Sequence, residues 1–227
     1  MSWLSKLIAS EGRSRADRAF DERRRAADTL SLAELDPSHS ILELEPGKGW
    51  FSGLLLELIN PLGSLVVQQP AELDGFFGKE ARKRIERSAN SNARYSAASW
   101  ETLDSDGHSI DRVVWLQGPH ELWFTPQPGV SFGKPSKVFA EIARVLKPGG
   151  KFLLIDNLAP PGVDQASAGA LHRSVPNELS ALVEETGLRL EHEDRDWICD
   201  TNDPLDIPTY DPKVHLKTRQ FAQVFMK

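Results

Sequence analysis

The chain has little cysteine, a deficit of positive charge and no long apolar run. Its one cysteine, Cys199, has no partner for a disulfide or a thiolate metal site, so the fold must depend on packing. The 27 Lys and Arg residues are outnumbered by 33 Asp and Glu, and the net charge of −6 has the wrong sign for a protein that mainly binds a phosphate backbone. The apolar patch at the N-terminus is too short for a signal peptide or a membrane span. We expect a cytoplasmic protein that binds neither nucleic acid nor membrane.

What the chain does contain is enough apolar material for one sizeable core. Hydrophobic residues make up 40% of its 227 residues, and no repeat or linker divides it, so we expect a single domain over residues 1–227. Charges of both signs surround an apolar stripe at residues 13–35, which predicts a helix. We expect residues 1–36 to form a helical lid on this domain.

Strands and helices alternate through the rest of the chain. The apolar run at residues 41–44 ends at Pro46-Gly47-Lys48-Gly49 and precedes a helical pattern, so the chain predicts a strand, a glycine turn and a helix. Further strands are expected at residues 65–67, 93–97, 113–116, 152–155, 188–191 and 221–226. Further helices are expected around residues 76–88, 138–146 and 177–186. Such alternation indicates a parallel sheet that is covered on both faces.

Ligands of open parallel sheets bind beyond the carboxyl ends of the strands. Gly47 and Gly49 lie at such an end, where they permit a tight turn and a close approach of the backbone to a ligand. A plain turn from strand to helix also needs glycine, so the glycines alone leave both interpretations open. A second feature is the irregular stretch at residues 200–214, rich in Pro and Asp, because loops of this length are usually functional or disordered.

Two motifs in combination resemble those of the class I S-adenosylmethionine (SAM)-dependent methyltransferases. Glu43 with Glu45-Pro46-Gly47-Lys48-Gly49 is similar to the family's acidic strand and Gly-x-Gly-x-Gly loop, with Glu45 at the position of the first glycine. Residues 143–150 are similar to the family's helix that ends in Leu-Lys-Pro-Gly-Gly before the fifth strand. A closer resemblance, to a family of predicted bacterial methyltransferases, covers nearly the full chain. It rests on residues 46–50, on His120 with Trp123, on Leu171-His172-Arg173 and on residues 217–221.

The resemblance implies an α/β, Rossmann-like fold whose seven-stranded mixed sheet has the order 3-2-1-4-5-7-6 and helices on both faces. The last strand, near residues 218–226, is expected to run antiparallel to the others. The implied cofactor is SAM, and the implied reaction is methyl transfer to an oxygen or nitrogen of a small molecule. The residues that the resemblance places around the cofactor are Glu43, Glu45, Pro46, Gly47, Gly49, Gln69, Ser99, Trp100 and Gln117.

Two positions depart from the family pattern. Members normally end the second strand with an acid that accepts hydrogen bonds from both ribose hydroxyls, and this chain has Gln69 there. The lost charge weakens such binding by about 1–2 kcal/mol. Ser99 stands where an Asp often meets the adenine amino group, although Trp100 can still pack on the adenine.

These departures leave other functions open. The chain can be a degenerate methyltransferase fold that acts as a non-catalytic binding or interaction module. A nicotinamide oxidoreductase is a further alternative, but the spacing of Gly47, Gly49 and Gly53 does not match the dinucleotide fingerprint.

Two histidines follow strand ends in the resemblance and are candidate general bases. His120 is the first choice, because the loop after the fourth strand closes over the crevice, where a neutral imidazole can take a proton from a hydroxyl or amine. His172 lies in a segment that often covers the substrate. Arg173 can bind a substrate carboxylate and Trp123 can line an aromatic pocket. Ordinary loop, surface or core roles stay open for all four.

No metal site is expected. Asp156-Asn157 is similar to two of the three cation ligands of metal-dependent catechol-type O-methyltransferases, but Leu116-Gln117 stands where the third, an Asp, would be. Two oxygen ligands make a poor Mg²⁺ site. The Pro-Pro-Tyr run of adenine and glutamine methyltransferases is also absent after the fourth strand, which agrees with the negative charge in arguing against nucleic-acid bases as substrates.

Overall fold

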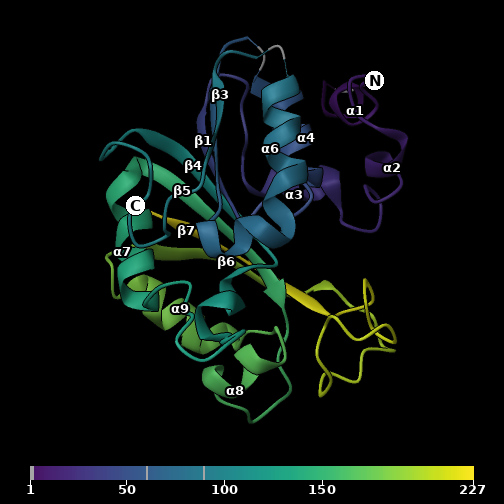
Figure 1. Ribbon diagram of the computed structural model, residues 1–227, viewed down its shortest axis with the longest axis vertical. Coiled ribbons are helices and arrows are strands. Elements are labelled where there is room, and N and C mark those ends of the chain that lie inside the picture. Colours follow the sequence, from purple (N-terminus) through teal and green to yellow (C-terminus); the bar gives the residue numbers. More distant parts are fainter. Residues whose placement is uncertain (1–2, 60, 89) are drawn as a thin grey trace.

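The computed structural model describes residues 3–59, 61–88 and 90–227, and a seven-stranded sheet lies at its centre (Figure 1). Its strands are β1 (Ser40–Leu44), β2 (Ser64–Gln68), β3 (Ala93–Ser96), β4 (Ile110–Leu116), β5 (Leu146–Asn157), β6 (Arg189–Ile198) and β7 (Gln220–Met226). Their order is β3-β2-β1-β4-β5-β7-β6. Neighbours from β3 to β5 pair in parallel, whereas β7 is antiparallel to both β5 and β6. The predicted strand order and the antiparallel last strand are confirmed.

Helices pack on both faces of the sheet. They are α1 (Trp3–Ile8), α2 (Arg15–Arg18), α3 (Ala26–Leu32), α4 (Trp50–Ile59), α5 (Ala71–Leu73), the π-helix η1 (Asp74–Gly78), α6 (Lys79–Arg87), the 3-10 helix η2 (Pro119–Trp123), α7 (Pro135–Val145), α8 (Gln165–Ala170) and α9 (Pro176–Glu184). Ile41 and Leu42 show how β1 serves both faces: Ile41 belongs to the cluster with α3 and α4, and Leu42 to the cluster with α7 and α9. No described helix is both long and apolar enough to cross a membrane.

Residues 13–35 do not form the single helix that their apolar stripe predicts. The segment folds as α2 and α3 with turns between them, and Arg25 has a left-handed φ of 50°. Buried polar bonds explain the break, because Arg13 donates two hydrogen bonds to Asp21, at 2.6 and 2.7 Å, and the indole N–H of Trp50 donates to the same carboxylate at 3.0 Å. Asp21 must therefore face the interior, which the stripe does not reveal. The lid role of residues 1–36 stays a prediction.

Several strands are longer than their apolar runs. β5 includes the predicted turn at Lys147-Pro148-Gly149-Gly150, because the N–H of Gly149 donates to the carbonyl of Lys227 and the N–H of Lys227 donates to that of Gly150. β6 continues to Ile198 although its burial pattern is mixed. Backbone pairing with β7 thus extends both strands beyond what hydrophobicity predicts. Residues 199–219 contain neither helix nor strand, in agreement with the irregular loop expected there.

The Arg13–Asp21 pair should be a main anchor of the N-terminal segment. Replacing Asp21 by alanine leaves the buried Arg13 guanidinium without its carboxylate, and the free energy of unfolding should fall by about 3 kcal/mol. The matched control is Asp28→Ala in the exposed pair with Arg25, which should cost less than about 1 kcal/mol. Urea unfolding followed by circular dichroism measures both, and equal losses in the two variants would contradict this assignment.

Candidate active site

The loop between β1 and α4 has the backbone of a glycine-rich turn. Glu45, Gly47 and Gly49 all have positive φ, of 52°, 55° and 79°. Glu45 thus adopts a glycine-like conformation at the position of the family's first glycine. A Cβ on Gly47 would meet no atom within 4 Å, whereas one on Gly49 would lie 3.2 Å from the backbone of Ala81. Gly47 therefore leaves room for a ligand, and Gly49 is needed for the close packing of α6.

The two acids of this motif point into the protein. Ser52, in the first turn of α4, donates a hydrogen bond of 2.5 Å to Glu43, so Glu43 joins β1 to that helix. Burial raises the pKa of Glu43 to about 7. Glu45 accepts a bond of 3.1 Å from the indole of Trp115, and burial, helped by the nearby charge of Glu121, raises the pKa of Glu45 well above its ordinary value. Contact between these two side chains and a cofactor stays a prediction.

Two adjacent glutamines, Gln68 at the end of β2 and Gln69 directly after it, differ in whether their side-chain amides are hydrogen-bonded. The amide of Gln68 donates to the carbonyls of residues 98, 99 and 102 and accepts from the N–H of Asp104, so it holds the loop after β3. Gln69 is fully buried, yet neither its amide nitrogen nor its amide oxygen has a hydrogen-bond partner among the described residues. An unsatisfied buried polar group costs about 1–3 kcal/mol. Ribose hydroxyls, which both donate and accept, would satisfy both atoms.

The loop after β3 carries Ser99 and Trp100, two of the predicted cofactor residues. The ring of Trp100 is fully buried, with its centroid 4.7 Å from that of Trp115 and 6.2 Å from that of Phe132. The indole packs in the core, its Nε1 has no hydrogen-bond partner among the described residues, and its contact with an adenine stays a prediction. Ser99 is exposed, and its hydroxyl accepts a hydrogen bond from the N–H of Glu101, which fixes the turn.

Asp156, at the end of β5, organises the loop that follows β4. Its carboxylate accepts hydrogen bonds from Nδ1 of His120 at 2.7 Å, from the backbone N–H of His120 at 3.0 Å and from the hydroxyl of Ser174 at 2.6 Å. Burial acts to lower the pKa of His120, but Asp156 and Glu121 outweigh it and raise this pKa to about 10. Both ring nitrogens of His120 face carboxylates, Nδ1 that of Asp156 at 2.7 Å and Nε2 that of Glu121 at 3.6 Å. Its prediction as the first-choice base is not supported by this geometry.

His172 is placed better for proton transfer. Its Nδ1 lies 3.1 Å from Oε1 of Glu121, a residue not predicted from the sequence, and a proton shared there leaves Nε2 as the basic nitrogen. His120 and His172 together outweigh the effect of burial on Glu121 and lower its pKa to about 2. The ring centroid of His172 lies 4.1 Å from that of Phe124 and 5.1 Å from that of the exposed Tyr210.

The same three side chains are the one set in the described part of the chain with metal-ligand geometry. Ligand atoms of His120, Glu121 and His172 lie within 4.8 Å of one another. Imidazole and carboxylate ligands of this kind suit Zn²⁺ and related ions. Asp156 and Asn157 do not complete the set: Asp156 binds His120, and Asn157 donates to the carbonyl of His172 and accepts from the hydroxyl of Thr218. That the chain has no resident metal stays a prediction.

Arg173 and Trp123 differ in how far they support a substrate role. Arg173 is fully buried, donates two hydrogen bonds to Asp203, at 2.9 and 2.7 Å, and also donates to two backbone carbonyls. The predicted contact of Arg173 with a substrate carboxylate is wrong for this arrangement, because its guanidinium is committed to holding the loop at residues 199–219. Trp123 is half-buried and packs against Gly169 of α8, and its substrate contact stays a prediction.

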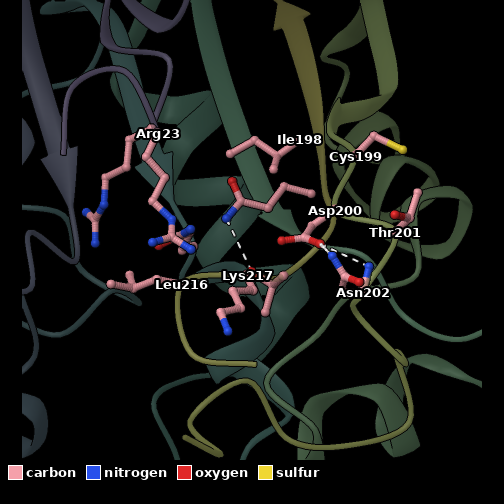
Figure 2. Close-up of a pocket in the computed structure, with 12 residues that line it drawn as sticks. Arg23, Ile198, Cys199, Asp200, Thr201, Asn202, Leu216 and Lys217 are labelled. Carbon is pink, nitrogen blue, oxygen red and sulfur yellow. Dashed lines mark hydrogen bonds between the residues drawn. The ribbon is translucent and has the colours of Figure 1, made fainter. Parts of the chain in front are cut away.

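A pocket of about 410 Å³ opens beside these groups (Figure 2). Gln117 lines it from the end of β4, where it has a positive φ of 58°, and Thr218 lines it from the segment that precedes β7. Two arginines of the N-terminal segment, Arg23 and Arg24, line its other side. The pocket thus lies at the predicted edge of the sheet, and the arginines were not predicted to take part in it.

Comparison with known proteins gives a consistent result. Residues 44–154 match the family described as "Methyltransferase domain". The chain is also 27% identical over 150 residues to "Uncharacterized methyltransferase YcgJ" of Bacillus subtilis (strain 168), an alignment that covers 64% of this chain and 51% of the relative. The chain thus matches about half the length of that relative.

Solved structures share the fold over nearly the whole chain. A SAM-dependent methyltransferase from Aquifex aeolicus superposes with a TM-score of 0.65 and 14% identity, covering 100% of this chain and 99% of that one. Geranyl diphosphate C-methyltransferase from Streptomyces coelicolor A3(2), solved with S-adenosyl-L-homocysteine, gives a TM-score of 0.62 at 12% identity, covering 97% and 83%. At these identities the similarity establishes the fold alone.

The raised pKa of Glu43 predicts a pH dependence of stability. In the unfolded chain Glu43 titrates near 4.5 and in the folded chain near 7, so its stabilising effect is complete below pH 4.5 and is lost as the pH rises through 7. The loss amounts to roughly 3 kcal/mol for a shift of this size. Glu43→Gln should remove this fall between pH 5 and 7.5 in urea unfolding measured at several pH values. Exposed Glu86→Gln is the control, and a slope unchanged in both variants would contradict the assignment.

Proposed function

We propose that this chain is a class I SAM-dependent methyltransferase that transfers a methyl group to an oxygen or nitrogen of a small molecule, a proposal supported by the methyltransferase-domain match over residues 44–154 and by the strand order of the sheet. The observation that carries the proposal is the buried, unpartnered amide of Gln69. Gln69 directly follows β2, which pairs with β1. The loop after β1 leaves open space at Gly47. Together these groups can hold a ribose and the chain that it carries.

The reaction asks little of the protein beyond alignment. SAM, when bound, would supply an activated methyl group for in-line displacement by a lone pair of the acceptor. The protein must therefore hold the acceptor in line and exclude water. The acceptor's proton needs one base, and we assign that role to Nε2 of His172, with Glu121 holding Nδ1.

The alternative of a non-catalytic binding module also has support. Gln69 and Ser99 stand where family members normally carry acids, and the side chain of Glu45 fills the space beneath Gly118, where a Cβ would lie 2.0 Å from it. Such a module can still bind the cofactor without turning it over. Binding and turnover must therefore be measured separately.

The first test uses the two adjacent glutamines. Gln69→Glu should lower the dissociation constant of S-adenosylhomocysteine about tenfold, because a charge-assisted bond to the ribose adds about 1–2 kcal/mol. Gln69→Ala should weaken binding, and isothermal titration calorimetry measures both. Gln68→Ala is the matched control: it removes the four bonds that hold the loop after β3, so it should lower thermal stability more than either change at Gln69. No binding by the wild type or by Gln69→Glu would contradict the proposed cofactor.

The second test concerns His172. His172→Asn should lower kcat by about 10²–10⁴ and leave S-adenosylhomocysteine affinity unchanged, because a general base acts on the acceptor alone. Asparagine suits this position, since it tolerates the left-handed φ of 53°. An acceptor is first found by following S-adenosylhomocysteine formation across a metabolite extract. Added imidazole should restore part of the activity of His172→Gly, and exposed His192→Asn should behave as wild type. Full activity of His172→Asn would show that alignment alone carries the reaction.

A further inference from the structure

The pocket beside Gln117 carries an excess of positive charge. Arg23, Arg24 and Lys217 line it, and Asp200 is its one carboxylate, in a chain whose net charge is −6. In Figure 2, Arg23 lies across the pocket from Asp200, with Lys217 between them. The pocket therefore has a cationic side and an acidic side.

The three cations form no ion pair within the described part of the chain. Among the described residues, none of their side chains has a hydrogen-bond or ion-pair partner, whereas the buried Arg13 and Arg173 are each bonded to a carboxylate. Asp200 accepts hydrogen bonds from the backbone and side chain of Asn202 instead. Cations gathered in one pocket without partners are the arrangement that a bound anion would complete.

Arg24 makes the strongest case among them. Its Nε atom is buried and unpartnered, and its guanidinium lies over two aromatic rings, 5.0 Å from the centre of Trp50 and 5.5 Å from that of Phe20. Burial and the neighbouring charge of Arg23 lower the pKa of Arg24 and outweigh the opposite effect of Asp17, which agrees with the absence of a bonded carboxylate. The two rings hold the guanidinium in place, so an anion would meet a pre-oriented partner.

Two contacts link this pocket to the proposed base. Thr218, which lines the pocket, donates a hydrogen bond of 2.7 Å to Asn157, and Asn157 donates one of 3.2 Å to the carbonyl of His172. Gln117 lines the same pocket from the end of β4, the strand before His120. A ligand held here would lie next to the segment that carries the base.

We propose that Arg23, Arg24 and Lys217 bind an anionic group, a carboxylate or a phosphate, of the methyl acceptor. The inference rests on the proposed function and narrows its substrate class to small molecules that carry such a group. Asp200, on the opposite side, lowers affinity for anions and so limits the charge that the pocket accepts.

Removing positive charges from the pocket and removing its negative charge should change the affinity for an anion in opposite directions, and this tests the inference. Pyrophosphate is the probe, and calorimetry gives its dissociation constant, which should rise at least tenfold in the double variant Arg23→Gln/Lys217→Gln because two charge-assisted contacts are lost. Arg24→Gln should raise it as well, whereas Asp200→Asn should lower it several-fold. Arg23 and Lys217 are exposed, so their replacement spares the core, and exposed Lys213→Gln on the same loop is the charge-matched control. Equal affinity in the double variant and in Lys213→Gln would overturn the proposal.

A second titration separates acceptor from cofactor. S-adenosylhomocysteine carries a carboxylate, and 5′-methylthioadenosine lacks it. If the double variant weakens binding of the first but not of the second, the cations bind the cofactor, and the assignment to the acceptor is overturned. Unchanged binding of both supports it. If the wild type binds pyrophosphate but not S-adenosylhomocysteine, the proposed function fails while the anion pocket stands.

Discussion

The carboxylate of Asp156 is the group on which the rest of this site depends. It is fully buried at the end of β5 and binds His120 twice, once through the backbone and once through the ring. It also accepts a bond from Ser174, which directly follows the His172–Arg173 pair. The side chain of Asp156 therefore joins the loop after β4 to the segment after α8. Asp156 holds His120 and Ser174 in place. These two residues lie next to Glu121 and close to His172 in the sequence, so the side chains of Glu121 and His172 meet.

The regular alternation of apolar runs and glycine turns along the chain predicted a parallel sheet, and the resemblance to the methyltransferase family supplied the strand order. What could not be predicted was the course of the N-terminal segment. An amphipathic stripe does not show that Arg13 and Asp21 will be buried together, or that Trp50, far along the chain, will bind the same carboxylate. Such bonds depend on which helices pack together, and they decide where a helix must break.

In the candidate site, too, residues defined by local sequence could be predicted, whereas roles that depend on residues distant in sequence could not. Gly47 and Gln69 could be found by position, because a turn and a strand end define them. The roles of Trp100 and Arg173 could not, since each is set by residues distant in sequence, Trp115 for the first and Asp203 for the second. For Glu121, its place next to His120 was the available signal. No sequence signal pointed to Arg23 and Arg24, because charged residues on the polar side of a predicted helix usually face solvent.

In the proposed site, the edge of the sheet between β2 and β4 holds the cofactor beside an acceptor pocket. A crystal structure of the protein with S-adenosylhomocysteine tests it most directly. We expect both ribose hydroxyls within hydrogen-bond distance of the Gln69 amide, with the sulfur directed toward Gln117 and the pocket of Figure 2. A ligand bound elsewhere, or a Gln69 amide still unpartnered at saturating ligand, would contradict it.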